Sequence, residues 1–296
     1  MLLFVVGGVG ALVGGAVCVI ARKWPQIEAP RLASETIASE VVHHPKLADH
    51  FRRHFDPRTE TGIALSIAST VVVAAAVGIG VILALVRTRF GVTSFDLRLA
   101  RYGAHRATPV STDVLRAISL IGGTSGVVLL SVAACSVELV RKPSRALPAF
   151  IALVVAGQFA LSNGIKILVE RARPDVNRLT GFAGSSFPSG HATAAAATLA
   201  AVALVTTRGR SRRVKVVVAG VAAGLAAMVG ATRVLLGVHW FSDVIAGLLL
   251  GWGWFALISI AFGGRLLNFG LPVAAAETIV DEIDTTTPGS PLLVEP

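Results

Sequence analysis

The chain has few charged side chains, few aromatic ones and almost no cysteine. Asp, Glu, Lys and Arg make up only 15% of its 296 residues, whereas 54% are hydrophobic. This balance excludes an ordinary soluble domain. Both cysteines, Cys18 and Cys135, lie inside apolar runs, where we expect them to be small buried side chains. They indicate neither a disulfide framework nor a metal site.

Long apolar runs take the place of the missing polar residues. The mean hydropathy is +0.74, and six or seven runs approach or exceed the roughly 20 residues that a helix needs to cross a bilayer. The sequence therefore predicts an all-α fold, a polytopic transmembrane helical bundle. The predicted spans lie near 2–21, 62–86, 116–140, 146–170, 190–207, 214–236 and 241–262.

The formal net charge of +10 is concentrated in two short connections, 208–215 and 141–145. Loops rich in Arg and Lys are retained in the cytoplasm. Because no aromatic residues interleave with these cations to stack bases, nucleic acid is not an expected partner. The orientation that follows places the connections 171–189 and 237–241 on the extracytoplasmic face of the cell membrane.

The segment 88–114 should share the extracytoplasmic face, although it is rich in arginine. Its Phe95–Tyr102 stretch has helical spacing, which predicts an amphipathic helix on the membrane surface. Three pairs of glycines have the four-residue spacing that lets helices approach closely. Packing within one bundle explains them without a dimer, and the sequence predicts no oligomeric state. The pairs are Gly10/Gly14, Gly220/Gly224 and Gly247/Gly251.

Both ends of the chain lie outside this pattern. Residues 1–21 have no basic residues before the apolar run, so we interpret them as a retained N-terminal transmembrane helix. Residues 22–61 form a polar cytoplasmic segment, and 263–296 a cytoplasmic tail that we expect to be disordered. His50 and His54 could share one helix face as metal ligands. Solvated loop histidines are far commoner, so we predict no metal and no other cofactor.

Three polar clusters stand at the ends of apolar runs. In the first, Lys166 and Arg173 are seven residues apart, which would place them on one face of the outer end of the fourth span. Pro174 then turns the chain out of the membrane. Such cations could bind a phosphate, although snorkelling to the interface is their commoner role.

The second cluster, Pro188–His191, immediately precedes an Ala-rich run and so predicts a helix start. Unpaired N–H groups at a helix start bind anions, and Ser189 and Gly190 suit a closely approaching phosphate. His191 would lie beside the phosphate, where an imidazolium could donate a proton. A capping Ser with an incidental His is the structural alternative.

In the third cluster, Arg233 lies near the outer end of one span and His239 opens the next, with Asp243 one turn further. A His and an Asp at i and i+4 face each other on a helix. The carboxylate can fix the imidazole tautomer and leave the other nitrogen free to attack. A structural pair is the alternative, but ionisable groups at membrane depth favour a function.

Together the clusters resemble the type 2 phosphatidic acid phosphatase superfamily, which includes lipid phosphate phosphatases and vanadium haloperoxidases. The family pattern is K-x6-R-P, P-S-G-H and S-R-x5-H-x3-D, and the chain departs from it only at Thr232, where Ser is usual. The resemblance covers about residues 62–262, including Phe95–Asp96. It implies a lipid phosphatase-like domain of six core helices, to which the N-terminal helix is an addition.

The resemblance also implies a metal-independent phosphatase with assigned roles. His239 would be the nucleophile that forms a phosphohistidine, oriented by Asp243, and His191 would protonate the leaving oxygen. The remaining predicted site residues would bind the phosphate. They are Lys166, Arg173, Ser189, Gly190 and Arg233.

The predicted substrate is a membrane lipid phosphate or diphosphate, with polyprenyl diphosphate preferred and phosphatidylglycerophosphate or phosphatidate as alternatives. A vanadium haloperoxidase shares the site but is expected to be soluble, so the apolar runs disfavour it. A non-enzymatic transporter is a more distant alternative. Its polar groups would sit at the midplane in broken helices, whereas these gather at helix ends on one face.

Overall fold

The computed structural model describes residues 1–23, 60–88, 92–141, 146–181 and 184–266, and these residues form helices and no strand. The helices are α1 (Leu2–Lys23), α4 (Glu60–Thr88), α5 (Val92–Arg106), α6 (Pro109–Ser119), the 3-10 turn η2 (Leu120–Gly122), α7 (Thr124–Arg141), α8 (Ala146–Val169), α9 (Gly190–Thr206), α10 (Arg212–Leu235) and α11 (Phe241–Leu266).

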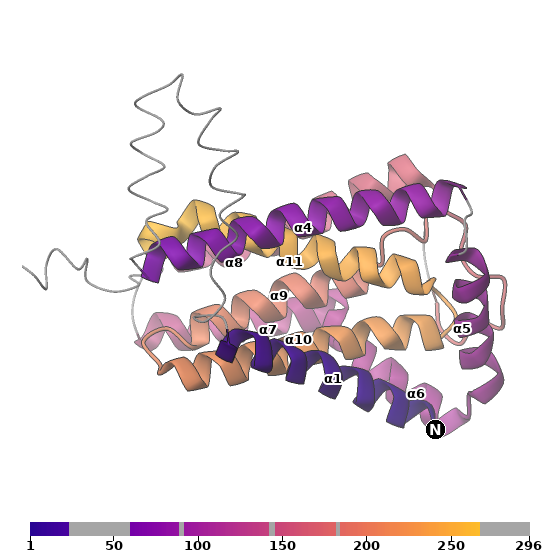
Figure 1. Ribbon diagram of the computed structural model, residues 1–296. Helices are drawn as coiled ribbons and strands as arrows, with labels where there is room; N and C mark the ends of the chain where they lie inside the picture. The colour runs from indigo at the N-terminus through magenta and orange to yellow at the C-terminus, as the bar shows by residue number, and fades with distance from the viewer. Residues whose placement is uncertain (24–59, 89–91, 142–145, 182–183, 267–296) are drawn as a thin grey trace, which may run out of the picture.

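Six of these helices are long and apolar enough to cross a membrane, namely α1, α4, α7, α8, α10 and α11. With the shorter apolar helix α9 they form the bundle in Figure 1. The prediction of an all-α, polytopic membrane protein with six core helices and one extra N-terminal helix is confirmed. The predicted segment 22–61, its His50/His54 pair and the tail 263–296 lie almost entirely outside the described residues.

Helix α9 lies at the centre of the bundle, in contact with α7, α8, α10 and α11. Most of its side chains are buried alanines, and such small side chains let neighbouring helices approach closely. A Cβ on Gly247 of α11 would lie 2.6 Å from the carbonyl oxygen of Ser189. This contact holds the N-terminus of α9 against the N-terminal half of α11.

The additional helix α1 packs along α10 through glycines. A Cβ on Gly14 would lie 2.7 Å from the carbonyl oxygen of Gly220, and one on Gly224 would lie 2.6 Å from that of Gly10. These predicted glycine pairs therefore serve packing within one chain. At its other end, α1 buries Leu2 and Val6 in a cluster that includes Leu236 and Val238.

The predicted continuous span 116–140 is wrong. Helix α6 ends at Ser119, η2 follows, and α7 begins only at Thr124. The turn lies against the start of α9, because a Cβ on Gly122 would lie 2.5 Å from the carbonyl oxygen of His191. Glycine at this position lets the chain turn where no side chain would fit.

The predicted amphipathic helix is confirmed as α5, which lies across one end of the bundle (Figure 1). It buries Asp96 and Ala100 completely, whereas Phe95 is 42% exposed. The ring of Phe95 packs edge-on against Phe241 of α11, with centroids 5.5 Å apart. Helix α5 is thereby attached to the first turn of α11.

We expect Gly14→Ala to destabilise the fold by about 1–3 kcal/mol, because the added methyl group collides with the α10 backbone. Gly15→Ala is the matched control, since a Cβ there meets nothing within 4 Å. Thermal unfolding of both variants in detergent measures the difference. Equal unfolding temperatures would show that the α1–α10 contact is looser than described.

Candidate active site

The three predicted clusters meet at the end of the bundle where α5 lies. They come from the C-terminal ends of α8 and α10, the N-terminus of α9 and the start of α11. The basic connection 208–215 joins the opposite ends of α9 and α10. The polar site and this basic connection therefore lie at opposite ends of the membrane helices.

Lys166, near the end of α8, reaches the N-terminus of α9. A Cβ on Gly190 would lie 3.3 Å from Lys166 Nζ and 3.8 Å from the hydroxyl of Ser162. The predicted helix start is confirmed, with Ser189 as N-cap and Gly190 as the first residue of α9. A side chain at position 190 would occupy the space beside the Lys166 ammonium group.

The prediction that Lys166 and Arg173 share one helix face is wrong. Helix α8 ends at Val169, and Glu170 has a left-handed backbone with φ 48°. Arg173 therefore lies in the following loop, where its guanidinium donates to the carbonyl oxygens of Gly184 and Val238 at 3.0 and 2.7 Å. The two cations still converge, because Lys166 lies within electrostatic range of Arg173.

His239 lies in the turn before α11 and not in its first turn as predicted. Its Nδ1 is 3.5 Å from Asp243 Oδ2, and its Nε2 is 3.3 Å from Arg173 Nη1. Since a guanidinium nitrogen can only donate, Nε2 must accept and the ring proton sits on Nδ1. Burial lowers the pKa of His239 to about 4, although Asp243 opposes the effect. The ring is therefore neutral at pH 7, with Nε2 unprotonated.

Arg233 and His191 complete the inner part of the site. Arg233 is 6% exposed, and its Nη1 donates to the hydroxyl of Ser119 at 2.8 Å. His191 lies within electrostatic range of Arg233 and His239. Its Nε2 is 3.6 Å from the position of a Cβ on Gly123.

Thr232, the one departure from the family pattern, does not point toward a ligand. Its hydroxyl donates to the carbonyl oxygen of Val229 at 2.6 Å, within α10. Thr232 is completely buried. A Ser at this position could make the same bond, so the substitution leaves the site unchanged.

Several buried polar atoms at this end have no hydrogen-bond partner among the described residues. They are Ser162 Oγ, Ser189 Oγ, Arg233 Nε and His239 Nδ1. Such atoms are uncommon, because an unpaired buried polar group costs about 1–3 kcal/mol. The first three can each donate a hydrogen to an anion with several oxygens, whereas His239 Nδ1 faces Asp243 Oδ2 at 3.5 Å.

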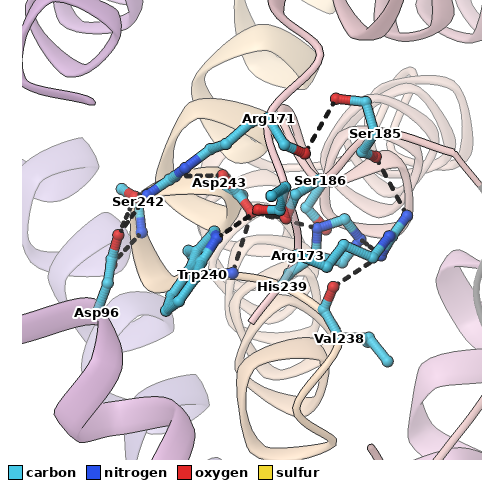
Figure 2. Close-up of polar contacts among 12 residues, drawn as sticks. Asp96, Arg171, Arg173, Ser185, Ser186, Val238, His239, Trp240, Ser242 and Asp243 are labelled. Atoms are coloured by element: carbon cyan, nitrogen blue, oxygen red, sulfur yellow. Dashed lines mark hydrogen bonds and ion pairs between the residues drawn. The ribbon is translucent and has the colours of Figure 1, made fainter. Parts of the chain in front are cut away.

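Other polar residues surround the predicted set. Asp243 accepts from Ser186 Oγ, from the backbone N–H of Trp240 at 3.0 Å and from Arg171 Nη1 at 2.5 Å (Figure 2). Arg171 also pairs with Asp96 of α5. We did not predict roles for Arg171, Ser186 or Ser119 from the sequence. The signals were weak: Arg171 occupies a variable position of K-x6-R-P, and Ser119 precedes a Gly-Gly interruption of an apolar run.

The arrangement can bind a tetrahedral oxyanion and attack it. Three cations and a helix N-terminus supply positive charge, and an unprotonated imidazole nitrogen faces the same space. Among the residues that the structure describes, no group of three His, Cys, Asp or Glu side chains is arranged to hold a metal ion.

Comparison with known proteins finds a family match over part of the chain. Residues 147–266 match the PAP2 superfamily. A lipid A 1-phosphatase of Rhizobium etli is 41% identical over 120 residues, which are 37% of this chain and 47% of the relative. The chain thus covers about half the length of that relative.

Two further matches cover more of the chain. Phosphatidylglycerophosphatase B of Bacillus subtilis is 29% identical over 185 residues, 60% of this chain and 88% of the relative. The crystal structure of a transmembrane PAP2 type phosphatidylglycerolphosphate phosphatase from Bacillus subtilis superposes with a TM-score of 0.62 at 26% identity. That match covers 67% of this chain and 98% of the crystallised one.

The pKa of His239 predicts how any reaction that uses its unprotonated Nε2 should respond to acid. Because burial lowers that pKa to about 4, the ring is neutral above pH 4 and becomes protonated as the pH falls through it. We expect kcat/KM for phosphate release to be lost on the acid side with an apparent pKa near 4. An acid limb near the ordinary histidine pKa of about 6.5 would contradict the buried, neutral ring.

Proposed function

We propose that the PAP2 superfamily domain of this membrane protein hydrolyses a lipid phosphate or diphosphate monoester through a phosphohistidine. One observation carries the proposal. His239 presents Nε2 to the side lined by Arg173, at 3.3 Å, and Nδ1 to Asp243, at 3.5 Å. An imidazole oriented in this way is a nucleophile aimed at a phosphate-binding space.

The reaction balances with the residues at hand. Nε2 attacks phosphorus, and the bond from phosphorus to the leaving oxygen breaks; this oxygen is the ester oxygen of a lipid phosphate or the bridging oxygen of a diphosphate. His191, protonated when the anionic substrate binds beside it, gives its proton to that oxygen. Water then attacks the phosphohistidine, His191 takes up a proton from it, and inorganic phosphate leaves with His239 restored. Asp243 stabilises the positive charge on the His239 ring while the phosphoryl group is attached.

Charge stabilisation would come from the cations around the two histidines. Lys166, Arg173 and Arg233 would neutralise the equatorial phosphoryl oxygens, and Ser189 with the N–H groups at the start of α9 would add hydrogen bonds. Arg233 is held for this role by Ser119, at 2.8 Å. Metal-independent catalysis follows from this set of donors.

We place the site on the extracytoplasmic face of the plasma membrane. The basic connection between α9 and α10, with Arg208, Arg210, Arg212, Arg213 and Lys215, lies at the end of the bundle opposite to the site. Short basic loops are retained in the cytoplasm, which leaves the site outside. An amphiphile could then present its phosphate at headgroup level while its tail remains in lipid.

Polyprenyl diphosphate is our proposed substrate, because its phosphates would lie at the depth of the site while its long tail stays in the bilayer. A phosphatidylglycerophosphate is the second candidate. It is favoured by the match over 88% of the Bacillus subtilis phosphatidylglycerophosphatase B. Both substrates end in a terminal phosphoryl group, held by a phosphoanhydride bond in the diphosphate and by an ester bond in phosphatidylglycerophosphate, so the same residues would act on either.

Phosphate release from a lipid panel in detergent with EDTA should identify the substrate. The panel contains polyprenyl diphosphate, phosphatidylglycerophosphate, phosphatidate and lipid A 1-phosphate, and we expect the highest kcat/KM for the first. A higher kcat/KM for phosphatidylglycerophosphate would show that this lipid, and not polyprenyl diphosphate, is the preferred substrate. Failure to release phosphate from any of them would contradict the proposed activity.

His239→Ala should lower kcat by about 10⁴-fold or more, since in the proposed reaction His239 alone carries the phosphoryl group. Labelling with a ³²P-lipid should give base-stable, acid-labile phosphate on the wild-type protein and none on this variant. His105→Ala is a matched control, because His105 is an exposed histidine of α5 at the same end. Label on purified His239→Ala protein would exclude His239 as the nucleophile.

A further inference from the structure

Arg171, two residues before Arg173, lies between two buried carboxylates. Its Nη1 lies 2.5 Å from Asp243 Oδ1 and its Nη2 lies 2.9 Å from Asp96 Oδ2. The Arg171 side chain is 13% exposed, and both carboxylates are completely buried. Figure 2 shows the guanidinium between Asp96 on one side and Asp243 on the other.

The donors of Arg171 are directed at protein acceptors and away from the phosphate-binding space. Nη1 also donates to Ser242 Oγ at 2.8 Å. The guanidinium lies over the Trp240 ring, 5.4 Å from its centroid, which adds a cation–π contact. Arg171 is therefore not placed as a fourth phosphate-binding cation.

The two arginines of this loop hold opposite sides of the His239–Asp243 pair. Arg173 contacts His239 at Nε2, the nitrogen that faces the phosphate. Arg171 contacts Asp243 at Oδ1, while Oδ2 faces the Nδ1 of His239. The position of the carboxylate, and through it that of the ring, depends on Arg171.

Asp96 connects this arrangement to α5. Its Oδ1 accepts from the backbone N–H of Ser242 at 3.0 Å, and its Oδ2 accepts from Ser242 Oγ at 2.5 Å and from Arg171. One carboxylate thus binds both the start of α11 and the Arg171 side chain. Removing Arg171 would leave two buried negative charges without their shared counter-ion, which is strongly unfavourable.

We propose that Arg171 and Asp96 are positioning residues of this site: they hold Asp243, and through it His239, and make α5 part of the catalytic structure. This inference rests on the proposed function, because it assigns the residues to the phosphohistidine reaction. Neither residue touches the substrate in this account. Their effect on the reaction passes through Asp243.

The charges around His239 determine how the inference can be tested by pH. Asp243 faces it from α11, Arg173 from the loop after α8, Arg233 from α10 and His191 from α9. Arg171 acts on the ring only by offsetting the negative charge of Asp243. Its removal should therefore make His239 easier to protonate and move the acid limb of kcat/KM to higher pH. Asp96→Asn removes a negative charge and should not raise the limb.

The test measures kcat, KM and the pH dependence of phosphate release for the full chain in detergent with EDTA. We expect Arg171→Gln to lower kcat/KM about 10- to 100-fold, mainly through kcat, and to raise the acid limb. Arg171→Lys should recover part of the loss. Arg106→Gln is the control, because Arg106 is an exposed arginine in the last turn of α5, at the same end of the bundle. It should behave as wild type.

The inference would be overturned if Arg171→Gln kept kcat/KM within about twofold of wild type and left the acid limb of the pH profile unchanged. If that variant does not fold, folded Arg171→Lys and Asp96→Asn decide the matter: wild-type kcat and pH profile in both would overturn it. If none of the three variants folds, the contacts of Arg171 with Asp96 and Asp243 are purely structural, and this outcome would also overturn the inference. Absence of phosphate release by the wild type would instead contradict the proposed function itself.

Discussion

The end of the bundle is organised around one buried carboxylate, Asp243. A completely buried charge must be compensated by partners, and Asp243 takes them from Arg171, Ser186, Trp240 and the facing ring of His239. Its backbone carbonyl also accepts from the N–H of Ser189 at 3.0 Å. The loop after α8, the N-terminus of α9 and the start of α11 are therefore fixed to one another through a single residue.

The second constraint is the short turn between α10 and α11. The carbonyl oxygen of Arg233 accepts from the N–H groups of both Val238 and His239, at 3.2 and 3.3 Å. Gly237 has a φ of 74°, a left-handed conformation that glycine adopts without strain. The five-residue spacing between Arg233 and His239 is thus the length of a turn that returns the chain to the end of the same helix. It places the His239 imidazole within electrostatic range of the Arg233 guanidinium.

The sequence predicted what depends on local patterns. The apolar runs, the helix start at Ser189–His191 and the amphipathic α5 all follow from periodicity and capping, and the structure has them. The prediction that Lys166 and Arg173 share a helix face was wrong, because it requires an unbroken helix and α8 ends at Val169. Arg171 and Asp96 could not be assigned, because their contacts join residues 71 to 146 positions apart. No sequence period encodes such distances.

The pairing of Arg171 determines the charge that remains for a ligand. Its cation is shared by Asp96 and Asp243, whereas Lys166, Arg173 and Arg233 lie within electrostatic range of one another. Like charges held together at the edge of a membrane repel strongly, because little water screens them. A phosphate relieves that repulsion and accepts hydrogen bonds from the unpaired groups at the start of α9. In the proposed reaction, negative charge spreads over the equatorial oxygens as the bond to the lipid breaks. Fixed cations around those oxygens therefore stabilise the transition state more strongly than they stabilise the bound lipid phosphate. In the proposed reaction, one cation thus holds the carboxylate and three bind the phosphate, so a single site would both orient a neutral histidine and attract a highly charged substrate.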